Sequence, residues 1–273
     1  MEDFKMLIEN VKKRGLTNFD VKLLGIVLMF IDHVYEMFSS VGVPDWFDYL
    51  GRPVATLFMF LSVEGFTHTH NQKRYITRLL IGFWIMNIGN TIINRSISVG
   101  NMAIMNNIFC DLFIGVLTMY GIQTISNGWQ QRRFSKQLLG GLIIATPIIL
   151  TILVTIISQT GINAFSAYFL LAIPTPLGAE NSIFLYLGPV LYLLRNHRGG
   201  QLFAIAVFAF LTTGFNFSGL LTTNTQWLEV LAVIPIAFYN GELGRSMKGF
   251  FYTFYPVHIW GLYILAALLG VKG

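Results

Sequence analysis

The sequence is poor in charge. Asp, Glu, Lys and Arg make up only 11% of its 273 residues, whereas 54% are hydrophobic. A soluble globular domain carries about 25% charged residues, so this chain lacks the charged surface that water requires. Phe (24 residues) and Gly (26) are abundant instead, as is common where helices pack in hydrocarbon. The composition therefore predicts an integral membrane protein.

Cysteine is nearly absent as well. Cys110 is the single cysteine, which excludes an intrachain disulfide and a cysteine-rich metal site. The sequence has no Walker loop, GxGxxG, GxSxG or HExxH signature, and we expect no metal site. The formal charge of +5 comes from short basic clusters between apolar runs, so we expect no nucleic-acid partner.

Apolar runs of helical length recur along the chain. A spanning helix needs about 20 mainly apolar residues. The candidate spans are Val21–Val41, Pro53–Thr67, Ile76–Ile93, Asn107–Ile125, Leu138–Ser158, Ile183–Leu194, Leu202–Phe217, Leu228–Tyr239 and Phe250–Leu269. A further stretch, Ala164–Ile173, is short and ends at proline, so it is either a span or an interfacial or re-entrant helix. We expect an all-α polytopic transmembrane helix bundle with about nine or ten spanning helices.

The connections between these runs alternate in charge, and every second connection is basic. The positive-inside rule places the basic connections, and with them the N-terminus, in the cytoplasm. Residues 1–20 are charged throughout and have no cleavage pattern of a signal peptide. Phe4, Leu7, Ile8 and Val11 recur at helical spacing, so this segment predicts a cytoplasmic amphipathic helix on the membrane surface. Residues 21–273 are expected to form a single transmembrane domain.

Three ionisable residues lie inside the first apolar run. Such groups are costly in a bilayer and normally face the bundle interior with a partner. The spacings of Asp32 to Glu36 and of His33 to Glu36 put the three on one side of a helix. A carboxylate beside an imidazole fixes its tautomer and stabilises its cation, as a general base requires. Asp32 and His33 are therefore candidate catalytic residues, and a hydrogen-bonded cluster that fixes helix packing is the alternative.

The second apolar run carries polar residues at both ends. Arg52 stands near its outer boundary, where its side chain could reach the membrane surface by snorkelling. A structural role and a functional role fit this position equally well. Glu64 lies toward the cytoplasmic side and shares a helix face with His68. We expect Glu64 to pair with a histidine, with Arg74 or with Arg78.

Two later runs also contain polar side chains. Asn107 and Asp111 are four residues apart on one face, a pattern that favours a helix–helix contact over a binding site. Tyr255 and His258 share a face of the last run, together with Phe251. His258 is compatible with a proton relay, a ligand contact or an ordinary hydrogen bond in the bundle.

Several blocks of these residues occur in a specific order. They are Lys22–His33, Gly51–Pro53, Phe58–Thr69, Asn107–Gly115 and Phe251–His258. In combination they resemble the TraX family, whose founding member acetylates the N-terminus of conjugative F-pilin. Residues 127–250 contribute little to the resemblance, and Asp111 stands where the family pattern has threonine.

The family is similar to a broader group of transmembrane acyltransferases that includes acyltransferase-3 and the lysosomal glucosaminide acetyltransferase. The resemblance implies a protein of the bacterial cell (inner or plasma) membrane that uses acetyl-CoA as co-substrate at the cytoplasmic face. It also implies a catalytic histidine within the membrane, which by motif matching is His33. The other motif positions are occupied by Asp32, Glu64 and His258, expected to be catalytic with His33, and by Arg52 and Tyr255, expected to bind substrate or cofactor. Asn107 and Asp111 of the block Asn107–Gly115 are also candidates for binding.

Acetyl-CoA carries phosphates, which basic side chains bind. The candidates at the cytoplasmic face are Lys73, Arg74, Arg78, Arg132 and Arg133, and each of them also serves as a topology signal. His33 could take a proton from an amine or hydroxyl of the acceptor, or carry the acetyl group itself. The acceptor is expected to be a membrane-associated or extracytoplasmic peptide, protein or glycan, such as a pilin N-terminus.

Two other functions fit the same residues. A proton-coupled transporter could use Asp32, His33, Glu64 and His258 as a relay, although the sequence shows no paired halves with matching broken helices. A non-catalytic partner in a secretion or conjugation assembly is the other alternative. The sequence gives no indication of the oligomeric state.

Overall fold

The computed structural model describes residues 14–159, 169, 172–179, 184–246 and 248–272. In these residues the chain is helical and has no β-sheet, with isolated bridges only at Leu16–Tyr239 and Val99–Met102. The predicted all-α class is confirmed. Residues 1–13 of the predicted amphipathic segment, and most of the stretch Ala164–Ile173, lie outside the described residues.

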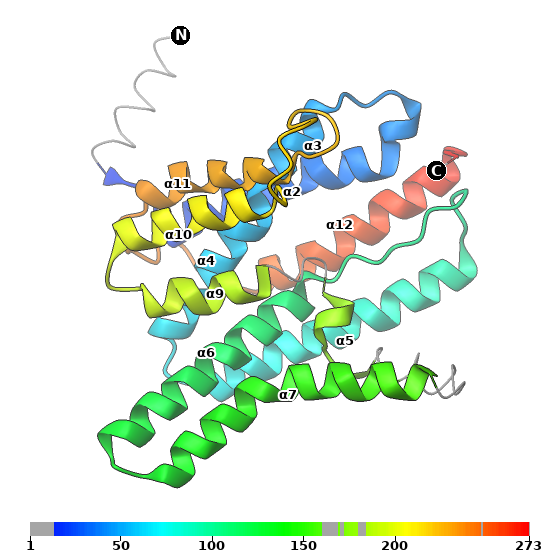
Figure 1. The fold of residues 1–273 in the computed structure, drawn as a ribbon. Coiled ribbons are helices and arrows are strands. Elements are labelled where there is room, and N and C mark those ends of the chain that lie inside the picture. The colour runs from blue at the N-terminus through cyan, green and yellow to red at the C-terminus, as the bar shows by residue number, and fades with distance from the viewer. Residues whose placement is uncertain (1–13, 160–168, 170–171, 180–183, 247, 273) are drawn as a thin grey trace. The chain divides into compact units, whose positions relative to one another are not determined.

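Long helices form most of the described chain (Figure 1). They are α2 (Asn18–Phe38), α4 (Pro53–His68), α5 (Gln72–Ser96), α6 (Ile108–Gln130), α7 (Phe134–Gln159) and α12 (Lys248–Leu268). The shorter elements are η1 (Ser39–Val41), α3 (Trp46–Gly51), η2 (Pro176–Gly178), α9 (Phe184–Leu193), α10 (Arg198–Leu211), η3 (Gln226–Ala232) and α11 (Val233–Ala237). Each long helix covers one predicted span to within a few residues.

Four helices of the described chain are long and apolar enough to cross a membrane. They are Gln72–Ser96, Ile108–Gln130, Phe134–Ile157 and Gly249–Leu268. They support a membrane protein, whereas the predicted total of nine or ten spans is not confirmed. Helix α4 is apolar but has only 16 residues, or about 24 Å at 1.5 Å per residue. The hydrocarbon layer is about 30 Å thick.

The last third of the chain differs from the predicted spans. Ile183–Leu194 contains α9, whose 10 described residues extend about 15 Å, and residues 180–183 before it lie outside the described residues. Leu202–Phe217 ends early, since α10 stops at Leu211 and positive φ angles follow at Gly214 and Phe215. Leu228–Tyr239 divides into the 3-10 helix η3 and the short α11. The hydrophobic runs predicted these helices but could not distinguish short apolar helices from complete spans.

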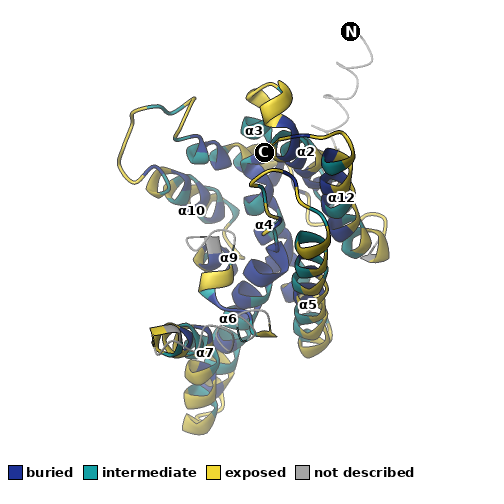
Figure 2. Ribbon diagram, turned by 90° about the vertical axis from the view of Figure 1, so that its right-hand side faces the viewer, coloured by how far each residue is buried: buried dark blue, intermediate teal, exposed yellow. Residues whose placement is uncertain are grey.

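The chain falls into two compact units. Unit 1 comprises Met1–Leu61, Ser98–Met102 and Leu194–Gly273, and unit 2 comprises Ser62–Ile97 and Ala103–Leu193. Unit 1 therefore contains α2, α3, α10, α11 and α12, and unit 2 contains α5, α6, α7 and α9. Helix α4 contributes to both and is buried along most of its length, as Figure 2 shows. An all-round apolar helix requires such burial.

In unit 1, the start of α2 is anchored to the chain that follows α11. A capping box of Thr17 and Asp20 satisfies the first turn of α2. The Leu16 amide donates to the Phe238 carbonyl at 2.7 Å, and the Asn240 amide donates to the Leu16 carbonyl at 2.9 Å. We call this pairing of Leu16 with Phe238 and Asn240 the α2 clasp. It fixes the position from which α2 carries its polar residues into unit 1.

In unit 2, α6 and α7 form a hairpin with a close contact at glycines (Figure 1). A Cβ at Gly140 would lie 2.6 Å from the Gly121 carbonyl oxygen and 2.9 Å from the Ile125 amide nitrogen. Small residues of this kind allow helix backbones to approach in membranes. Much of α7 is exposed, including Leu138 and Ile152, as expected for side chains that face lipid.

Adjacent glycines of α7 provide a test of this packing. Gly140→Ala should lower the free energy of unfolding by about 1–3 kcal/mol, because the backbone of α6 blocks the added methyl group. Gly141→Ala is the matched control, since a Cβ at Gly141 meets nothing within 4 Å. Thermal unfolding in detergent, followed by circular dichroism, measures both. Equal melting temperatures for the two variants would contradict the close contact.

Candidate functional site

Two buried histidines meet in unit 1. His33 comes from α2 and His258 from α12, helices that pack against each other. The Nδ1 atom of His33 lies 2.7 Å from the Nε2 atom of His258. The residues are only 5% and 6% exposed, so this hydrogen bond forms away from water. We call this contact the histidine pair.

The hydrogen bonds around the histidine pair determine which nitrogens carry protons. The Nδ1 atom of His258 lies 2.7 Å from the Phe254 carbonyl oxygen, and a carbonyl oxygen can only accept. Nδ1 of His258 is therefore the protonated nitrogen, and Nε2 of the neutral ring is an acceptor. His33 must then donate from Nδ1, which leaves the Nε2 lone pair of neutral His33 unprotonated. An unprotonated Nε2 is what a general base or a nucleophile requires.

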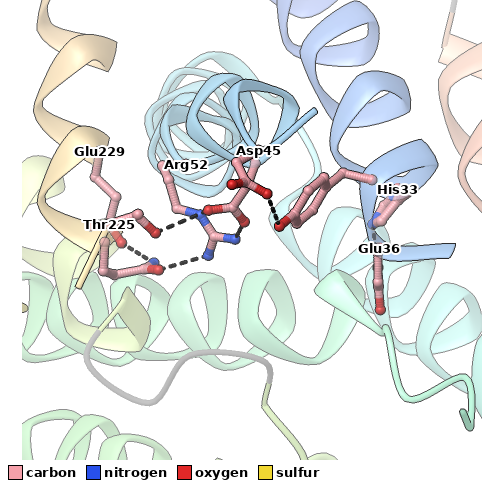
Figure 3. Close-up of polar contacts among 9 residues, drawn as sticks. His33, Glu36, Asp45, Arg52, Thr225 and Glu229 are labelled. Atoms are coloured by element: carbon pink, nitrogen blue, oxygen red, sulfur yellow. Dashed lines mark hydrogen bonds and ion pairs between the residues drawn. The ribbon is translucent and has the colours of Figure 1, made fainter. Parts of the chain in front are cut away.

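The Nε2 edge of His33 faces Glu36, one turn later on α2. The Oε2 atom of Glu36 lies 3.8 Å from this nitrogen, and the Glu36 side chain is 41% exposed. Figure 3 shows the two residues on successive turns of the helix. The predicted grouping of His33 with Glu36 is confirmed. A cation formed at Nε2 would lie beside this carboxylate.

Aromatic rings surround the histidine pair. Phe254 stacks on His258 with a centroid distance of 4.6 Å. Tyr255 presents its ring edge-on to His33 at 6.4 Å and to His258 at 5.8 Å. The predicted shared face of Tyr255 and His258 is confirmed. These rings restrict rotation of the imidazoles and keep the surroundings apolar, which strengthens their hydrogen bond.

Asp32 has a different neighbour from the one the sequence suggested. Its carboxylate packs against Gly51, so closely that a Cβ at that glycine would overlap it. Asp32 was expected to fix the His33 tautomer, but His258 occupies the Nδ1 side of that ring. The physical reason is helix geometry, because adjacent residues on a helix do not face each other. A catalytic role for Asp32 stays a prediction.

Arg52 joins a polar network at the start of α4, shown in Figure 3. It forms an ion pair with Asp48 and donates from Nη1 to Gln226 at 2.9 Å. Thr225 donates to the second oxygen of Asp48 at 3.0 Å, and Gln226 donates to Glu229. The network holds α3 and α4 to η3. Sequence reasoning missed all its members except Arg52, although the i,i+4 spacing of Asp48 and Arg52 was an available signal.

The remaining predicted site residues belong to unit 2. The Glu64 carboxylate lies 3.8 Å from Nδ1 of His68, which confirms the expected proximity to a histidine. Asn107 is buried and donates from Nδ2 to the Phe83 carbonyl at 3.1 Å and to Asn87 at 2.7 Å. These bonds hold the start of α6 against α5, which supports the interpretation of Asn107 as a helix-contact residue. Asp111 is also buried.

The predicted phosphate-binding residues are exposed at the ends of unit 2 helices. Lys73, Arg74 and Arg78 lie in the first two turns of α5, and Arg132 and Arg133 follow the end of α6. Because α5 and α6 are sequential neighbours that pack together, these positions lie toward the same end of the pair. In the described residues, no group of three or more His, Cys, Asp or Glu side chains could hold a metal ion.

Comparison with known proteins identifies the family. The family model described as TraX protein matches residues 19–266. The chain belongs to the TraX family. A curated relative, the probable fimbrial assembly protein FimC, serogroup H1, of Dichelobacter nodosus, is 36% identical over 66 residues. That match covers 23% of this TraX-family chain and only 26% of the relative. No solved structure matches the chain.

The contact of Asp32 with Gly51 can be tested by a double-mutant cycle. Gly51→Ala should lower the free energy of unfolding by about 1–3 kcal/mol, since the methyl group must displace the carboxylate. The same change in an Asp32→Ala background should cost less, because the two closest overlapping atoms, Oδ1 and Cγ of Asp32, are gone and only its Cβ remains. Gly261→Ala on α12 is the control, with nothing within 4 Å of its Cβ. Additive effects of the two substitutions would refute the contact.

Proposed function

We propose that this TraX-family protein is an acetyl-CoA-dependent membrane acetyltransferase. It transfers the acetyl group to an amine or hydroxyl of a membrane-associated or extracytoplasmic acceptor, such as the N-terminus of a pilin-like peptide. The observation that carries the proposal is the histidine pair, which leaves Nε2 of His33 unprotonated inside an apolar site. Family membership and the fimbrial relative support a pilus or fimbrial subunit as acceptor.

The reaction requires one proton to be moved. The acceptor amine attacks the thioester carbonyl carbon, a C–N bond forms, and the C–S bond breaks. Nε2 of His33 removes the proton that the nitrogen loses and returns a proton to the sulfur of the departing CoA. In the two-step variant, Nε2 attacks the thioester carbonyl, the C–S bond breaks and CoA leaves as a thiolate. The amine then attacks the acetyl group, the bond from the acetyl carbon to Nε2 breaks, and the proton that the amine loses passes through Nε2 to the CoA sulfur. Both routes start from the same unprotonated nitrogen.

Acetyl-CoA would bind from the cytoplasmic side. The exposed basic residues at the start of α5 and after the end of α6 supply charges for its phosphates, and the positive-inside rule places them in the cytoplasm with the N-terminus. The protein would thus be a multi-pass protein of the bacterial inner membrane. The family match of residues 19–266 extends over both units, which supports one catalytic domain from residue 21 to 273.

Removal of the His33 imidazole tests the proposed chemistry. His33→Ala should reduce acetyl transfer by about 100-fold or more, the usual range for loss of a general base. The assay uses purified protein in detergent, acetyl-CoA and a pilin-type peptide with a free N-terminus, and it measures CoA thiol release and peptide mass. His197→Ala, which removes an exposed histidine of unit 1, should retain activity. Undiminished transfer by a folded His33→Ala protein would refute the mechanism.

The proposed binding of the acetyl-CoA phosphates by basic side chains leads to a second prediction. Lys73→Gln combined with Arg74→Gln should raise the KM for acetyl-CoA about fivefold with little change in kcat, because exposed charges contribute up to about 1 kcal/mol each. The effect should shrink at high ionic strength. Arg95→Gln is the control, because Arg95 is an exposed cation in the last turn of the same helix. An equal rise in KM for the control would show that general charge, rather than position, is responsible.

A further inference from the structure

We infer that His258 is a positioning residue that sets the tautomer of His33 and shares the proton that His33 takes up. The inference rests on the proposed acetyl transfer at His33 and assigns a separate role to the second ring. It depends on a chain of two hydrogen bonds, from His33 to His258 and from His258 to the Phe254 carbonyl.

Only one arrangement of two neutral rings satisfies both hydrogen bonds. If His258 carried its proton on Nε2, its Nδ1 lone pair would face the Phe254 oxygen at 2.7 Å, an unfavourable contact between two acceptors. Its Nε2–H would then also require an acceptor at Nδ1 of His33, which would move the proton of His33 to Nε2. The Phe254 carbonyl therefore determines, through His258, which nitrogen of His33 is free.

The position of the free nitrogen matters for access. Nδ1 of His33 is occupied by His258, whereas Nε2 points to the side of Glu36. The bond to His258 thus directs the basic nitrogen toward the partly exposed Glu36 side chain. Without an acceptor at that position, the ring of His33 could carry its proton on either nitrogen, and part of the protein would present an N–H where a lone pair is needed.

The histidine pair can also hold one additional proton while its two existing hydrogen bonds are kept. After Nε2 of His33 takes the proton of the amine, the imidazolium still donates from Nδ1 to His258, now as a stronger, charge-assisted bond. If the Nδ1 proton moves to His258, that ring donates to both His33 and the Phe254 carbonyl. The proton then returns through Nε2 of His33 to the CoA sulfur, and the pair regains its neutral state.

Substitution of His258 by two residues of different chemistry separates positioning from packing. His258→Gln places an amide oxygen near the position of Nε2, where it can accept from His33. His258→Leu fills similar space but offers no acceptor. We expect His258→Leu to lose about 10- to 100-fold in kcat with an unchanged KM for acetyl-CoA, because the tautomer of His33 is no longer fixed and its imidazolium loses a charge-assisted hydrogen bond. His258→Gln should retain kcat within about threefold.

Nitrogen-15 NMR of histidine-labelled protein reads the tautomer directly. The native protein and His258→Gln should each show a neutral Nδ1–H tautomer that disappears in His33→Ala, and His258→Leu should not hold it. The inference is overturned if His33 is an Nε2–H tautomer in the native protein. It is also overturned if His258→Leu keeps full kcat, or if folded His258→Gln is as inactive as His258→Leu.

These outcomes are distinct from failure of the proposed function. If His33→Ala still transfers acetyl groups, the acetyltransferase mechanism fails, whatever the state of His258. If His33→Ala is inactive and His258→Leu is fully active, only the role of His258 fails. The NMR measurement tests the tautomer in either case, because it needs no substrate.

Discussion

The hydrogen bond between His33 and His258 is the interaction on which the site depends. Each buried ring provides a hydrogen-bond partner for the other, and the Phe254 carbonyl accepts the last hydrogen bond of the series. A neutral ring costs much less to bury than a carboxylate or an imidazolium. The pair therefore places an unprotonated imidazole nitrogen within an apolar bundle while no charge has to be buried.

Unit 1 accommodates its other buried polar groups differently. Around Arg52, opposite charges and amides are combined in one network that includes Asp48, Gln226 and the almost fully buried Glu229. Loss of one member of such a network leaves a buried charge without compensation. The network connects α3 and α4 with η3, and through Gly51 it adjoins Asp32. This network is separate from the histidine pair. Asp32 of α2 lies next to the network through Gly51, whereas His33 of α2 contacts His258.

The sequence predicted the long helices well because their apolar runs and boundaries are local properties. It did not predict the early end of α10 or the division of the next run into η3 and α11, because hydrophobicity alone does not determine the length of a helix. For the site, spacing alone grouped His33 with Glu36 correctly. The sequence analysis also paired His33 with Asp32. Consecutive side chains on a helix point in different directions, so this contact is not favoured. The contact with His258 joins residues 225 positions apart, and a single sequence contains no local signal for it.

The α2 clasp has a consequence for biosynthesis. Leu16 pairs with Phe238 and Asn240, so the first described helix obtains its anchor only after most of the chain has left the ribosome. His33 obtains its partner His258 later still, when the final helix α12 has been made. Until then the nascent α2 holds His33 in or near lipid without its native partner His258, and formation of the histidine pair is necessarily one of the last events of folding. A chain that stops before its last helix cannot form that pair.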